Sequence, residues 1–204
     1  GNASGSVTQT SGNITSGTFS AGDLSFSRFT QTSTAANTVT LTGSNTLSIS
    51  NSSVFGGDVN FRAPLLTTNG TTFNGAATLE KTGGTDNYWG GNTFEDATTI
   101  TNSGSAELIL GNTNADTFND AAIFNNTGSY RIRIAFNHNG QTTTFANSVT
   151  LNSNKSGGTD QWSFLIGENA NSHVTFMGSL TINVAGTLRS DHRFLNGPGS
   201  IGTF

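Results

Sequence analysis

The stretch Phe118-Asn119-Asp120-Ala121-Ala122-Ile123-Phe124 contains the pattern that decides the fold: a phenylalanine, three residues, a small or aliphatic residue, one residue, and a large apolar residue. Around it the pattern recurs as Phe55-x3-Val59-x-Phe61, Phe73-x3-Ala77-x-Leu79, Phe94-x3-Thr98-x-Ile100, Phe145-x3-Val149-x-Leu151 and Phe176-x3-Leu180-x-Ile182, with a looser copy at Phe19, Leu24 and Phe26. From Phe55 onward the phenylalanines are 18, 21, 24, 27 and 31 residues apart. Repeats on this scale indicate stacked coils, each too small to bury its own apolar face.

Short alternating apolar segments separated by Gly, Asn and Ser clusters fill the rest of the chain. Segments such as Tyr130-Ile132-Ile134-Phe136 have the period of two that is typical of strands, and clusters such as Asn126-Thr127-Gly128 are typical of turns. We therefore expect an all-β fold, a right-handed parallel β-solenoid whose coils contain about 18–31 residues. It should be one continuous segment over residues 1–204, part of a longer repeat array. An antiparallel sandwich is disfavoured because it need not repeat one motif at successive strands.

Composition excludes several classes of protein. Only 10% of the residues are charged and the net charge is -4, so the chain lacks the basic stripe that nucleic-acid binding requires. There are no cysteines, which excludes disulfide scaffolds and Cys-ligated metal sites. No apolar run approaches the roughly 20 residues that span a bilayer, so we expect no membrane insertion. We expect no cofactor.

A longer motif recurs after 74 residues and supplies the best candidate site. Lys81-Thr82-Gly83-Gly84-Thr85-Asp86-Asn87-Tyr88-Trp89 is similar to Lys155-Ser156-Gly157-Gly158-Thr159-Asp160-Gln161-Trp162. An exposed aromatic ring beside a carboxylate can stack on a sugar while the acid accepts hydroxyl hydrogen bonds, so the candidate glycan-binding residues are Asp86, Tyr88, Trp89, Asp160 and Trp162. The competing interpretation is a long turn whose aromatic residue fills the coil interior, because Trp is usually largely buried.

Other chemistry has less support in the sequence. Glu95, Asp96, Asp116 and Asp120 fall in equivalent turns before strands, but no calcium-loop motif is present and solvated acids are the favoured interpretation. Asp191-His192-Arg193 is the only dense polar group that resembles catalytic equipment, and neighbours on a strand point to opposite faces. We therefore predict no catalytic residue, no metal and no enzyme activity. Repeated Thr pairs raise ice binding, which the irregular coil spacing disfavours.

The Thr/Asn/Ser/Gly richness, the absence of Cys and the irregular Phe-x3 coils resemble the β-strand-repeat regions of large bacterial surface adhesins, of the filamentous-haemagglutinin or gliding-motility type. That resemblance implies a solenoid stalk, an extracellular location at the cell surface, and adhesion. Its partners would be neighbouring repeats of the same chain or identical subunits end to end, and surface glycans. The function expected is a stiff segment of a surface filament. The alternative is a carbohydrate-binding or polysaccharide-degrading β-helix module, which a groove lined by Tyr88, Trp89, Trp162 and acids would distinguish.

Overall fold

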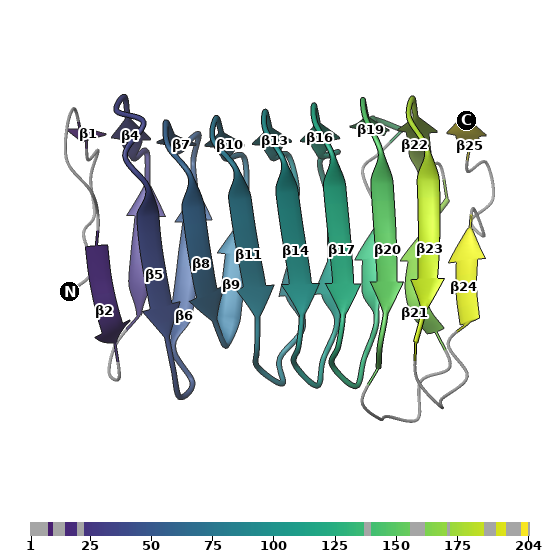
Figure 1. Cartoon of the computed structure of the whole chain (residues 1–204), viewed down its shortest axis with the longest axis horizontal. Coiled ribbons are helices and arrows are strands. Elements are labelled where there is room, and N and C mark those ends of the chain that lie inside the picture. Colours follow the sequence, from purple (N-terminus) through teal and green to yellow (C-terminus); the bar gives the residue numbers. More distant parts are fainter. Residues whose placement is uncertain are drawn as a thin grey trace.

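Successive coils of three short strands stack into a right-handed parallel β-solenoid (Figure 1). The computed structural model describes residues 8–9, 15–19, 23–136, 140–155, 162–170, 172–185, 191–194 and 201–203. Within each sheet, neighbouring strands come from successive coils and pair in parallel, as expected from the repeated motif. The prediction of the fold class is confirmed, and the number of strands in a coil is three.

The strands form two long sheets and a third face. The nine-stranded sheet contains β1 (Thr8–Gln9), β4 (Thr30–Gln31), β7 (Val54–Phe55), β10 (Thr72–Phe73), β13 (Thr93–Phe94), β16 (Thr117–Phe118), β19 (Thr142–Phe145), β22 (His173–Phe176) and β25 (Ile201–Thr203). The eight-stranded sheet contains β2 (Thr15–Phe19), β5 (Asn37–Leu41), β8 (Val59–Ala63), β11 (Ala77–Lys81), β14 (Thr98–Asn102), β17 (Ala122–Asn126), β20 (Val149–Ser153) and β23 (Leu180–Val184).

The third face is divided between a three-stranded and a five-stranded sheet. The first contains β3 (Leu24–Ser27), β6 (Thr46–Ser50) and β9 (Leu65–Thr68); the second contains β12 (Asn87–Tyr88), β15 (Leu108–Ile109), β18 (Ile132–Ile134), β21 (Trp162–Ile166) and β24 (Asp191–Phe194). A single bridge between Asn69 and Gly90 joins them. The three faces together enclose one narrow apolar core.

The recurring motif spans the corner between the two long sheets. In one coil, Phe118 ends β16, three residues turn the corner, and Ala122 and Phe124 point inward from β17. The phenylalanines of successive coils then lie directly above one another. Their rings stack at centroid distances of 4.7–5.6 Å and interplanar angles of 5–15°, through Phe55, Phe73, Phe94, Phe118, Phe145 and Phe176. Each is fully or almost fully buried, so this ladder runs along the core.

The looser copy of the motif is not part of this ladder. Phe19 pairs with Leu41 in the eight-stranded sheet, whereas Phe26 pairs with Ile49 on the third face. The position equivalent to Phe55 in the preceding coil is Gln31, which is buried and accepts a hydrogen bond of 2.6 Å from the Asn37 amide. The looser copy of the motif at residues 19–26 therefore adds no rung to the ladder, because those residues occupy other faces of the coil.

Variation in coil length leaves the central strands of the eight-stranded sheet in register. The strands β8, β11, β14, β17 and β20 pair without any shift of register although the coils that they belong to differ in length. The outward rows of the eight-stranded sheet are therefore regular, so irregular spacing was the wrong reason to disfavour ice binding. The Thr rows are interrupted because other residues occupy some of the outward positions, among them Asn60, Arg62, Glu80 and Ile123.

The corner between the third face and the nine-stranded sheet is turned through a left-handed backbone conformation. At seven successive passages from the third face to the nine-stranded sheet, from β3–β4 to β21–β22, the chain turns this corner through a residue with positive φ. These residues are Arg28, Asn51, Gly70, Gly91, Gly111, Ala135 and Gly167. Glycine adopts this conformation without penalty, whereas Arg28 and Ala135 adopt it at a cost of about 1–2 kcal/mol. The candidate site lies along this corner and the strands that lead to it.

Candidate functional site

The first copy of the longer motif directs its two aromatic side chains to opposite sides of the third face, one into the core and one to the surface. β12 runs through Asn87 and Tyr88, and Asn87 and Trp89 point into the core while Tyr88 points outward. Trp89 is 0% exposed, and its indole N–H donates to the Leu66 carbonyl. A ring in this position cannot stack on a sugar without leaving the core. Trp89 thus matches the competing interpretation of the motif, in which an aromatic residue fills the coil interior.

Asp86 and Tyr88 remain at the surface. Tyr88 is 47% exposed, which leaves a large part of its ring open to solvent. Asp86 is exposed as well, and its carboxylate accepts a hydrogen bond of 2.9 Å from the backbone N–H of Glu107 in the next coil. Asp86 therefore has a structural contact across the coils, and Tyr88 is the aromatic residue of this copy that a ligand can reach.

The second copy lies elsewhere on the third face. Trp162 begins β21 and is partly buried, with the Arg193 guanidinium 5.6 Å from the centroid of its ring. Asp160 lies outside the described residues. The strands β15 and β18 separate β21 from β12, so Trp162 does not meet Tyr88. The single groove expected from Tyr88, Trp89, Trp162 and acids is therefore not formed.

The lysine of the first copy is buried and bonded to backbone carbonyls. Lys81 ends β11 with its side chain buried in the coil, and its ammonium donates to the carbonyls of Gly83 at 2.7 Å and Ala106 at 3.2 Å. Burial lowers the pKa of Lys81 to about 8, and the nearby Asp86 carboxylate partly opposes this shift. Lys81 thus ties the turn of its own coil to the next one.

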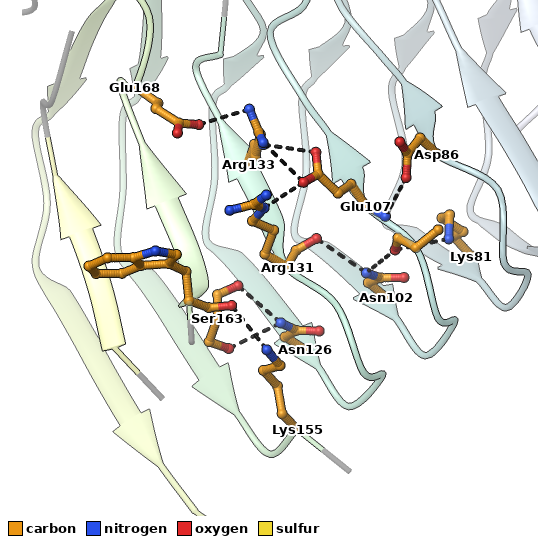
Figure 2. Close-up of polar contacts among 12 residues, drawn as sticks. Lys81, Asp86, Asn102, Glu107, Asn126, Arg131, Arg133, Lys155, Ser163 and Glu168 are labelled. Atoms are coloured by element: carbon orange, nitrogen blue, oxygen red, sulfur yellow. Dashed lines mark hydrogen bonds and ion pairs between the residues drawn. The ribbon is translucent and has the colours of Figure 1, made fainter. Parts of the chain in front are cut away.

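Buried amides continue this role in the following coils. Asn102 occupies the position equivalent to Lys81 and donates to the Ala106 carbonyl at 3.0 Å, and Asn126 in the next coil donates to the Ser163 carbonyl at 3.0 Å (Figure 2). Because a buried carbonyl without a donor is costly, these side chains satisfy the backbone of wide turns. The lysine of the repeated Lys-(Thr/Ser)-Gly-Gly motif is thus explained largely by the need to bond the backbone of these turns.

A network of ion pairs covers part of the third face. Glu107 faces both Arg131 and Arg133 (Figure 2), at 2.5 Å and 2.8 Å. Arg133 also pairs with Glu168 at 2.9 Å. Sequence spacing alone does not predict this contact, since Glu107 lies 24 residues before Arg131 and meets it only when coils stack. These charges are largely neutralised within the protein.

Beside Tyr88 the surface is hollowed into a groove of about 440 Å³. It lies along the positive-φ corner, across several coils. The residues that line it are Ser50, Asn51, Ser52, Asn69, Gly70, Tyr88, Gly90, Asn112, Thr113 and Asn114. No residue of this lining carries a charge. Its volume is within the range of small-molecule sites, about 300–1,000 Å³. Of this set, only Tyr88 was a candidate from the sequence; the other residues stand in polar turns such as Asn69-Gly70, which carry no separate signal.

The acids considered for calcium are bound by protein groups. The Asp116 carboxylate is fully buried and accepts hydrogen bonds from the Asn92 backbone at 2.9 Å and from the Gly111 backbone at 2.7 Å. Asp120 accepts from Asn147, and Glu95 from Asn119. Burial raises the pKa of Asp116 to about 6, although the hydrogen bonds from Asn92 and Gly111 oppose this shift. Among the described residues, no group of three or more His, Cys, Asp or Glu could hold a metal ion.

Comparison of the chain with protein-family models, with curated proteins and with solved structures found no match. The described part of the chain contains no helix long and apolar enough to cross a membrane.

Proposed function

We propose that this chain is a stiff structural segment of an exported bacterial surface adhesin or filament. The observation that supports this role best is the unbroken register of the eight-stranded sheet from β5 to β23, across coils of different length. Each inner strand is hydrogen-bonded on both sides, so bending the stack would distort many backbone hydrogen bonds at once. The stack of nine strands spans roughly 38 Å at the usual strand spacing of about 4.8 Å.

Its sequence features fit a spacer at the cell surface. The stack is ordered without disulfides, and its outer rows are mostly Thr and Asn, which form side-chain ladders such as Asn183 to Asn152 at 2.9 Å and Asn152 to Asn125 at 2.8 Å. The resemblance to the β-strand repeats of bacterial adhesins supports the same role. The proposed partners are adjoining coils of the same chain or identical subunits end to end.

Single-molecule pulling between the chain ends tests the mechanical part of this proposal. Because each coil contacts only its neighbours, the stack should yield in steps of one coil, and coils of about 18–31 residues release roughly 60–110 Å each. Smooth extension at low force, as for an unfolded chain, would contradict a stiff spacer. An antibody against the chain should label intact producing cells; labelling only after permeabilisation would contradict the surface location.

The alternative role is that of a carbohydrate-active module, and it has two forms: degradation of a carbohydrate, and binding without catalysis. Glycoside hydrolysis usually requires a pair of carboxyl groups facing the substrate, and no carboxylate lines the groove beside Tyr88. The nearby Glu107 is held by two arginines. Degradation therefore gains no support from this site. Binding without catalysis is favoured by the groove itself.

A further inference from the structure

We propose that the groove beside Tyr88 binds a neutral carbohydrate chain. The groove runs across the corners of four successive coils, and Gly70 and Gly90 are among its lining residues. Gly90 allows the backbone of the next coil to pack closely against this lining. A Cβ on Gly90 would lie 2.3 Å from the Asn112 carbonyl oxygen, so this position excludes any larger residue. The site is distinct from the stalk role, and neither proposal depends on the other.

The wall of the groove nearest the C-terminus is the long corner segment 110–116. The buried Asp116 carboxylate fixes this segment by accepting hydrogen bonds from the Gly111 backbone and the Asn92 side chain. The Gln141 side chain accepts a hydrogen bond of 3.0 Å from the Ala115 backbone. The Asn114 carbonyl also accepts from Gly91 at 3.1 Å. A wall fixed by this many bonds is organised before a ligand arrives, which lowers the entropy that binding must overcome.

Two residues of the groove have an unfavourable backbone conformation. Ser52 has φ 60° and Thr113 has φ 74°, each in addition to the residue with positive φ that turns the corner of its coil. For a β-branched residue such as Thr113 this conformation is a true outlier. Such residues cluster at binding sites, where the surrounding structure holds them in place.

The groups exposed in the groove define the chemistry of its ligand. Side-chain amides and hydroxyls supply both donors and acceptors, and no charged side chain is among them. Within the part of the chain that the structure describes, the side-chain amides of Asn69 and Asn112 make no hydrogen bond to another protein group. A ligand that satisfies them must be uncharged and rich in groups that both donate and accept, as the hydroxyls of a sugar do.

Tyr88 supplies the apolar surface that complements these amides. The residue is 47% exposed and lines the groove, and its backbone is fixed by the pairing of β12 with β15. One face of a pyranose ring presents C–H groups, which pack on an aromatic ring while the hydroxyls at its edge reach the amides. Phosphate-bearing ligands are disfavoured because no Lys or Arg lines the groove.

An array of neutral, sialylated and sulfated oligosaccharides, with uncharged Asn- and Ser-rich peptides as a further set, tests this proposal on the whole chain. We expect binding to neutral oligosaccharides. The best neutral oligosaccharide is then titrated calorimetrically against variants. Tyr88→Ala should weaken its binding by roughly tenfold or more, as loss of an aromatic anchor does, whereas Tyr88→Phe should retain most of it. Asn112→Ala should weaken it by roughly threefold to tenfold.

Tyr130→Ala is the matched control, since it removes the other tyrosine of the chain, which lies outside the groove. It should leave binding unchanged. Far-UV circular dichroism establishes that each variant is folded. The proposal is overturned if no neutral oligosaccharide binds at millimolar concentration, if only charged oligosaccharides or peptides bind, or if Tyr88→Ala and Asn112→Ala bind as the wild type does. None of these outcomes bears on the stepwise extension expected of the stalk.

Discussion

Replacing Phe118 with alanine tests whether the phenylalanine ladder holds the coils together. Phe118 is 1% exposed, and its ring centroid lies 4.7 Å from those of both Phe94 and Phe145. It also meets the edge of Phe124 at 5.7 Å. Alanine would remove all three ring contacts and leave a cavity between coils in the middle of the stack.

The expected loss of stability follows from this packing. Truncating a buried phenylalanine to alanine costs about 3–5 kcal/mol, depending on how well the site collapses. Backbone pairing keeps neighbouring coils about 4.8 Å apart, so this cavity cannot close, and we expect about 4–5 kcal/mol. Phe118→Leu retains most of the volume but loses three ring contacts worth about 0.5–1.5 kcal/mol each, so we expect about 2–3 kcal/mol.

Urea unfolding followed by far-UV circular dichroism measures both changes. Ile123→Ala on the adjacent strand β17 is the control: the residue points outward and is 37% exposed, and the change in the free energy of unfolding should stay within about 1 kcal/mol. A loss below about 2 kcal/mol for Phe118→Ala, or one no larger than for Phe118→Leu, would refute the reasoning. It would mean that backbone pairing, not ring packing, holds the coils.

Three further predictions concern charged groups and the corner. Because the pKa of Asp116 is raised to about 6, the folded state binds this proton more tightly than the unfolded state, and stability should fall by up to about 3 kcal/mol as the pH rises from about 4 to 6. Asp116→Asn should remove that decrease in urea midpoints; an unchanged pH profile would contradict it. Glu107→Gln should lower the free energy of unfolding by about 2–4 kcal/mol, since two largely buried arginines lose the carboxylate that they share, while Arg133 keeps its ion pair with Glu168; a loss below about 0.5 kcal/mol would mean that other groups already compensate them. Gly111→Ala at φ 67° should destabilise the protein by about 1–2 kcal/mol. Ala135→Gly at φ 54° should change its stability by less than about 1 kcal/mol, because relief of backbone strain is offset by the loss of a buried methyl group and by the freedom of glycine in the unfolded chain; a loss in thermal unfolding for Gly111→Ala no larger than for Ala135→Gly would contradict this.

Much of the fold could be predicted from the sequence because the Phe motif repeats a physical requirement. A buried ring needs another ring above and below it, so Phe73, Phe94 and Phe118 predict their own stacking. The looser copy at Phe19 misled because spacing alone does not say which face of a coil a residue belongs to. Its register was decided by pairing with Leu41 in the next coil.

The candidate site could be predicted only in part. Adjacent residues on a strand point to opposite sides, so Tyr88 and Trp89 could not both be exposed, but the sequence does not say which of them is buried. The core position of Asn87, whose amide donates to the Leu66 carbonyl at 2.7 Å, decided that Trp89 points inward. The wall of the groove at Asn112 and Asn114 had no sequence signal, because a long polar turn resembles any other.

By itself the sequence determined the architecture of this protein: parallel coils, an aromatic ladder and a wall of Thr and Asn, all of which follow from local periodicity repeated along the chain. Only the tertiary structure decided which side chains meet. Glu107 reaches Arg131 and Arg133, and Tyr88 borders Asn69 and Asn112, because coils of unequal length stack with their strands in register. Contacts between coils depend on how each corner absorbs its extra residues, and that is settled by packing rather than by periodicity.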